Sequence, residues 1–109
     1  MSRKLMVHEF GMGVDLHGLD GTKAACRAVF DALRHSSLPF YRGVRERGGK
    51  MYVDVTVAVP AGVNVDMEIV KKELPHGEVT VTAVPGGLRV PNADTVIACA
   101  AITVSVDEP

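Results

Sequence analysis

One segment restricts the fold of this chain more than any other, namely KMYVDVTVAV, residues Lys50 to Val59. Apolar residues occupy every second position from Met51 onward, and Asp54 and Thr56 lie between them. Because neighbouring side chains of a β-strand point to opposite faces of a sheet, this alternation predicts a strand with one buried face. Such a strand needs partner strands and a second layer over its valines.

Two segments have the pattern of amphipathic helices that could form this layer. The first runs from about Asp20 to His35 and begins at an Asp or Thr that can cap it. Its apolar positions at helical spacing are Ala25, Val29, Ala32 and Leu33. The second runs from Asp66 to Leu74, with Asp66 as the expected cap and Pro75 as its stop. We expect the first helix to pack on the valines of the Met51 to Val59 strand.

Further strands are expected on both sides of these segments. The patterns predict a first strand from Arg3 to Glu9, ended by the glycines that follow, and a last strand from Thr95 to Val106. The segments EVTVTAV and LRV, joined by PGG, are typical of a hairpin. The segment from Pro39 to Lys50 is rich in Arg and Gly, which indicates an exposed loop.

The predicted fold class is therefore α/β (α+β). We expect residues 1–109 to form a single two-layer domain, a mixed sheet of four to five strands with two helices on one face.

The composition argues against two kinds of partner. The chain has 12 Lys and Arg residues and 13 Asp and Glu residues, so there is no excess of positive charge to neutralise nucleic-acid phosphates. No apolar run approaches the roughly 20 residues of a membrane span, and the N-terminal residues lack the features of a secretory signal. Cys26 and Cys99 lie in apolar segments, where free thiols behave as small hydrophobes. We expect a cytoplasmic protein with no nucleic-acid and no membrane partner.

The outer face of the predicted sheet is rich in threonine and small residues instead of Lys and Glu. Either this face is solvated, or sheets from several copies pack around a symmetry axis. We expect a homo-oligomer, with a trimer or a multiple of it as the first expectation.

The segment FGMGVDLHGLDGTKAACRAV, Phe10 to Val29, carries the candidate site. Gly11, Gly13 and Gly18 allow close backbone approach, and the following helix begins with unpaired N–H groups. Lys23 and Arg27 stand four residues apart on one helical face, so both could reach one anion. These residues predict a ligand-binding site for a carboxylate or phosphate. The glycine spacing differs from the dinucleotide fingerprint.

Asp15 and His17 lie two residues apart and leave three interpretations open. They could form a turn through side-chain hydrogen bonds, an acid/base pair in which the aspartate orients the imidazole, or a metal set with Glu9 or His8. No cluster of spaced Cys and His supports a metal, so neither a metal nor a cofactor is predicted. Cys26 as a nucleophile, and His35 with its serine neighbours as a catalytic pair, are disfavoured.

The sequence resembles a family of short conserved proteins of bacteria and some plants that are described as uncharacterised. The resemblance rests on GMGVDLHG and TKAACRAV, followed by VTVAVP, LPHGEVTV, GGLRVP and IACAAITVSVD, and covers nearly the whole chain. The sequence departs from the family pattern at Leu19, where glutamine is usual, and is short between GGLRVP and IACAAIT. The resemblance implies family membership and no particular activity.

Two classes of function follow from these residues. The first is a small oligomeric enzyme of the hydrolase, lyase or isomerase type that binds a polar anionic metabolite at the glycine-rich loop and helix N-terminus. In it Lys23 and Arg27 hold the anion, and His17 with Asp15 exchanges protons. The second is a non-catalytic metabolite-binding or scaffolding module.

Overall fold

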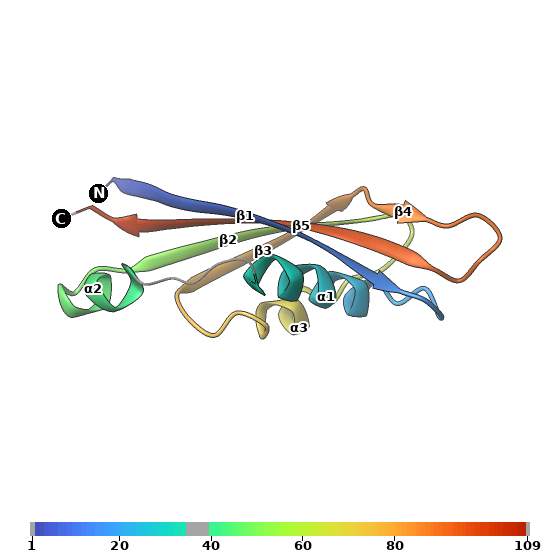
Figure 1. Cartoon of the computed structure of the whole chain (residues 1–109), viewed down its shortest axis with the longest axis horizontal. Helices are drawn as coiled ribbons and strands as arrows, with labels where there is room; N and C mark the ends of the chain where they lie inside the picture. Colours follow the sequence, from blue (N-terminus) through green and yellow to red (C-terminus); the bar gives the residue numbers. More distant parts are fainter. Residues whose placement is uncertain (1, 35–39, 109) are drawn as a thin grey trace.

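The computed structural model describes residues 2–34 and 40–108. The described residues form five strands and three helices, in an order shown in Figure 1. Along the chain these are β1 (Arg3–Asp15), α1 (Gly21–Arg34), α2 (Phe40–Glu46), β2 (Met51–Val59), α3 (Met67–Lys71), β3 (Glu78–Pro85), β4 (Leu88–Arg89) and β5 (Val96–Asp107).

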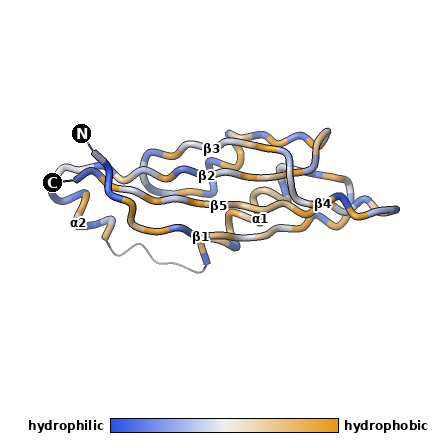
Figure 2. Tube along the Cα trace, turned by 90° about the horizontal axis from the view of Figure 1, so that it is seen from above, coloured by the Kyte–Doolittle hydropathy of each residue, from blue (hydrophilic) through white to orange (hydrophobic). Residues whose placement is uncertain are grey.

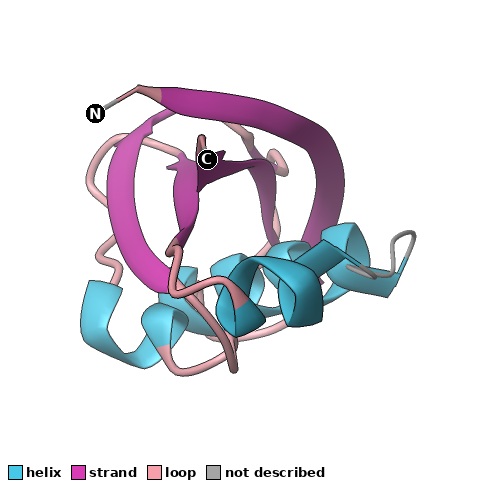
Figure 3. Cartoon of the chain, turned by 90° about the vertical axis from the view of Figure 1, so that its left-hand side faces the viewer, coloured by secondary structure: helices cyan, strands magenta, loops and turns pink. Residues whose placement is uncertain are grey.

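The strands form one mixed sheet in the order β1-β5-β2-β3, with β4 paired to β5. Figure 2 shows the four long strands side by side. Strand β5 is antiparallel to both β1 and β2, whereas β2 and β3 are parallel. The helices gather on one side of the curved sheet (Figure 3). The predicted α/β fold, a small two-layer domain, is confirmed, with a third short helix in addition to the two expected.

The core lies between α1 and the inner face of the sheet. Val55 and Val57 are 2% and 0% exposed, which confirms the predicted buried face of the Met51 to Val59 strand. On α1, Ala25, Val29 and Ala32 are fully buried, as expected. The helix lies mainly over β1 and β5 and touches β2 less. Burying each larger side chain contributes about 1.5–3 kcal/mol, which fixes the register of the strands.

Both predicted helix starts are confirmed by their caps. The Asp20 carboxylate accepts a hydrogen bond from the Lys23 N–H at 3.0 Å, and the Asp66 carboxylate accepts from the N–H groups of Glu68 and Ile69. Helix α3 ends at Lys71, earlier than the predicted Leu74. No helix in the described part of the chain is long and apolar enough to cross a membrane.

The expected exposed loop from Pro39 to Lys50 is a helix over much of its length. Helix α2 forms because Val44 is buried and Phe40 and Tyr41 pack against the core, which gives the segment an apolar face that its arginines obscure. Pro39 lies outside the described residues.

The predicted hairpin is also wrong. Strand β3 pairs with β2 in parallel, and β4 pairs with β5, so the segments EVTVTAV and LRV have different partners. The Pro85–Gly86–Gly87 turn carries the chain from one partner to the other, with the Gly86 N–H donating to the Val59 carbonyl at 2.8 Å.

Candidate functional site

The first strand does not end at its glycines. Strand β1 continues from Arg3 to Asp15, so Gly11 and Gly13 are strand residues and not part of a loop, contrary to the expectation. Both lie directly beneath α1. A Cβ on Gly11 would lie 2.2 Å from the Ala28 carbonyl oxygen, and one on Gly13 would lie 2.2 Å from the Ala24 carbonyl oxygen. The structure thus gives these two glycines a packing role, because only a residue without a side chain lets the helix backbone come this close.

Asp15, the last residue of β1, organises the turn into α1. Its side chain is buried, and its carboxylate accepts a hydrogen bond from the Asp20 N–H at 2.9 Å. Lys23 Nζ lies 4.0 Å and Arg27 Nη1 3.8 Å from the other carboxylate oxygen. Lys23 and Arg27, which were predicted to bind one external anion, therefore both lie at ion-pair distance from the Asp15 carboxylate. A buried carboxylate needs such partners to offset the loss of its hydration.

Arg27 has a second internal contact, since its guanidinium donates to the Val14 carbonyl. The Asp20 carboxylate already occupies the start of α1 as its cap. Gly21 packs against Asn64 and Val63, which lie in the loop between β2 and α3. These contacts leave the predicted anion site partly filled by the protein's own groups.

His17 lies in the turn between β1 and α1 with an exposed side chain. Within the described residues it makes no hydrogen bond or ion pair, with Asp15 or with any other group. Gly18, the next residue, has a positive φ of +97°, a conformation that glycine adopts without strain. The Leu19 N–H donates to the Asp94 carbonyl at 3.2 Å, and this hydrogen bond connects the turn to the segment that precedes β5.

The other sequence candidates are placed as follows. Cys26 is half-buried, and burial, with the nearby Glu73 carboxylate, raises the pKa of its thiol to about 11, which disfavours it as a nucleophile. Cys99 is exposed, and it lies on the outer sheet face opposite Met12 of β1. His35, Ser36 and Ser37 lie outside the described residues. Residues 2–34 and 40–108 contain no group of three His, Cys, Asp or Glu side chains that could hold a metal ion.

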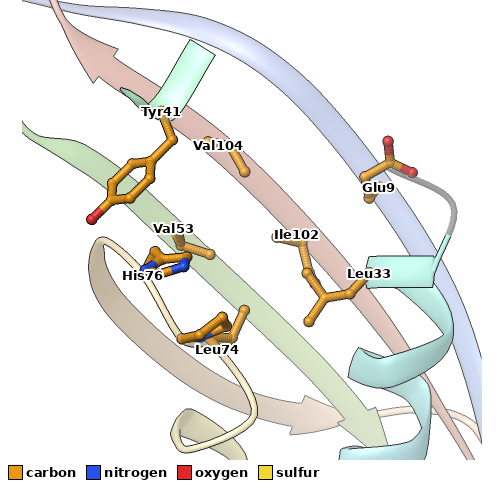
Figure 4. Close-up of a pocket in the computed structure, with 9 residues that line it drawn as sticks. Glu9, Leu33, Tyr41, Val53, Leu74, His76, Ile102 and Val104 are labelled. Carbon is orange, nitrogen blue, oxygen red and sulfur yellow. The ribbon is translucent and has the colours of Figure 1, made fainter. Parts of the chain in front are cut away.

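The structure contains a pocket that the sequence did not indicate. It has a volume of about 370 Å³ and lies between the inner face of the sheet, the end of α1, helix α2 and the segment after α3. Its lining residues, most of them labelled in Figure 4, are Glu9, Leu33, Tyr41, Val53, Leu74, Pro75, His76, Ile102 and Val104. We call this the apolar pocket, because most of its walls are aliphatic side chains.

Three polar side chains stand around these aliphatic walls. The rings of Tyr41 and His76 are stacked with centroids 4.8 Å apart and form one side of the pocket. Glu9, on β1, lies on the side opposite to them (Figure 4). The pocket therefore has an apolar floor and two polar ends of different chemistry.

Nothing in the local sequence pattern could reveal this pocket, because its walls come from β1, β2, β5, α1, α2 and the α3–β3 segment. Glu9 is a carboxylate on the inward-facing side of its strand, next to Ile102 in the sheet, but this position alone does not indicate a pocket. His76, in the segment that follows α3, also belongs to the pocket wall.

The fold is that of a small two-layer α/β domain with one mixed sheet. The chain belongs to the family of conserved hypothetical proteins named Lin0512_fam, whose model matches residues 5–104. Among solved structures, it is similar to an FtsZ-like protein of unknown function from Nostoc punctiforme. That protein shares 37% identity, with 99% of each chain covered and a TM-score of 0.83. A search of curated proteins found no match.

Proposed function

We propose that this protein is a non-catalytic metabolite-binding module of the cytoplasm, and that its ligand occupies the apolar pocket. The observation that carries the proposal is the pocket itself, a cavity of about 370 Å³ with aliphatic walls and a few polar groups at its ends. Small-molecule sites in proteins have this size and this division between apolar walls and a small number of orienting polar groups.

Binding without catalysis is favoured over the enzyme hypothesis because the predicted acid/base pair is not assembled. Asp15 is engaged by the Asp20 N–H and by two cations, and His17 is exposed without a partner among the described residues. A general base needs a group that orients it and a reacting atom within hydrogen-bond reach.

Filling the pocket tests this proposal. The variant Val104→Phe places extra volume in the pocket, because Val104 lines it from β5. We expect the parent protein to bind a fluorescent probe with an apolar ring system, such as anilinonaphthalene sulfonate, and the variant to lose this binding. The melting temperature should change by only a few degrees, since the added ring enters an existing space. Fluorescence titration and thermal unfolding measure the two effects.

Val57→Phe is the matched control. Val57 is fully buried and does not line the apolar pocket, so the same change there overpacks a closed core and costs about 1–3 kcal/mol of unfolding free energy. Equal destabilisation by both substitutions, or probe binding that survives Val104→Phe, would count against the pocket as the ligand site.

The module is proposed to work as a homo-oligomer, with the outer sheet face between copies. On this face Phe10 and Met12 are 66% and 57% exposed. Their outward-facing neighbours on β5, Ala101 and Cys99, carry no charge. Exposed apolar clusters of this kind are typical of interaction surfaces.

The two edges of the sheet differ in a way that supports assembly. Helix α1 covers the β1 edge at Met12 and Val14, because the Asp31 carboxylate accepts from the Met12 N–H at 2.9 Å and Arg27 donates to the Val14 carbonyl. At the β3 edge, the segment Val79 to Val84 contains no charged residue and no proline. Proteins usually protect an exposed edge strand with such residues, so an unprotected one favours pairing with a second chain.

The thiol of Cys99 reports on this assembly directly. We expect its reaction with an aromatic disulfide reagent at pH 8 to slow at least tenfold as the protein concentration rises through the range in which light scattering shows oligomers. Cys26 contributes little to the signal, because a pKa of about 11 leaves about a thousandth of it as thiolate.

Ala101→Arg is the control for the thiol experiment. It places an unpaired charge on the proposed interface, which should split the oligomer and restore fast labelling at every concentration. A monomeric parent protein with fast labelling throughout would refute the outer face as an interface.

A further inference from the structure

A second hollow adjoins the apolar pocket. It has a volume of about 260 Å³, and its polar lining includes Tyr41, Arg45, Lys50 and Glu78. The two hollows share Tyr41, and the chain neighbours His76 and Gly77 line one each. The stacked rings of Tyr41 and His76 thus stand at the junction, with apolar walls on one side and two cations on the other. We call the second hollow the cationic hollow.

The cations near this hollow differ in the contacts that they already make. Arg47 donates to the Asp107 carbonyl, and Lys50 Nζ lies 3.9 Å from the Glu78 carboxylate. Arg45, in the last turn of α2, lines the hollow without a carboxylate at ion-pair distance among the residues that the structure describes. Its guanidinium, which offers several N–H donors, is therefore available to an anionic group.

We propose that the ligand of this protein is a small amphipathic anion, with its apolar body in the apolar pocket and a carboxylate or phosphate group in the cationic hollow at Arg45. This inference rests on the proposed function and adds the chemical class of the ligand to it. The aliphatic side chains of Leu33, Val53 and Ile102 contact the body. The orientation is fixed by charge, because Glu9 lies on the opposite side of the pocket and repels an anion there (Figure 4).

The test compares three ligands that share one apolar chain, namely octanoate, octyl phosphate and the neutral octanol. Isothermal titration of the full chain should give dissociation constants at least about tenfold lower for one or both anions than for octanol, the size of effect expected from a charge-assisted hydrogen bond. The variant Arg45→Ala should remove this preference and leave octanol binding unchanged. Arg42→Ala, which changes an arginine of the same helix that does not line either hollow, should behave like the parent protein.

The outcomes separate the inference from the proposal beneath it. Octanol that binds as tightly as both anions, or an anion preference that survives Arg45→Ala, overturns the inference while the apolar pocket stays the ligand site. If none of the three compounds binds, and Val104→Phe changes no probe binding, both the inference and the proposed function fail. A preference for only one of the anions supports the inference and identifies the head group as carboxylate or phosphate.

Discussion

Replacing Gly13 with alanine is expected to lower the unfolding free energy by roughly 3 kcal/mol or more, which corresponds to a fall in melting temperature of about 10–20 °C. A Cβ at this position would lie 2.2 Å from the Ala24 carbonyl oxygen and 2.3 Å from the Ala28 backbone nitrogen. Both are helix backbone atoms, so α1 must move away from β1 as a unit, and the core that it covers opens with it. Thermal and urea unfolding of the purified variant measure the loss.

Gly43→Ala provides the matched control for this substitution. Gly43 lies inside α2, its φ is not in the left-handed region, and no atom lies within 4 Å of the position of an added Cβ. The same chemical change is expected to leave stability unchanged or to raise it by about 0.5–1 kcal/mol, because alanine favours the helix. A Gly13→Ala protein as stable as the parent would contradict the close contact between α1 and β1.

The elements with strong local patterns could be predicted from the sequence. The segment from Lys50 to Val59 predicts β2 to within one residue, and Asp66 caps α3 as its position indicates. Strand pairing is decided by contacts between distant segments. The sequence Pro-Gly-Gly therefore predicted a hairpin between two strands, β3 and β4, that pair with β2 and β5 instead.

The prediction that Gly11 and Gly13 belong to a loop is wrong for a physical reason. A glycine has the same sequence signature whether it provides a positive φ in a turn or room for a neighbouring backbone in a strand. The distinguishing signal lay elsewhere, in the small residues Ala24, Ala28 and Ala32 at four-residue spacing on α1. These are the residues that contact Gly11 and Gly13. The apolar pocket had no comparable signal, because it exists only once six separate elements are assembled.

Asp15→Ala is expected to lower the unfolding free energy by about 2–4 kcal/mol. The buried carboxylate accepts the Asp20 N–H and lies within 4.0 Å of both Lys23 and Arg27, so its removal leaves that N–H without its acceptor and two cations without their anion. Asp15→Asn separates these contributions, because an amide oxygen still accepts the N–H while the charge is gone. We expect the unfolding free energy of Asp15→Asn, measured by thermal and urea unfolding, to lie between that of the parent protein and that of the alanine variant.

Lys23→Ala and Arg27→Ala decide between the internal role of this cluster and the predicted anion site. If the cations serve Asp15, each substitution removes one half-exposed ion pair, costs about 1 kcal/mol of stability or less, and leaves binding of carboxylates and phosphates unchanged. If they instead hold a ligand, each weakens its binding by about 1.5–3 kcal/mol with little change in melting temperature. His17→Ala completes the comparison, since the enzyme hypothesis requires it to abolish turnover while affinity is kept. The His17 imidazole is exposed and has no partner among the described residues, so we expect His17→Ala to alter neither binding nor stability. A substrate whose turnover is lost in His17→Ala would contradict the binding module and favour the enzyme.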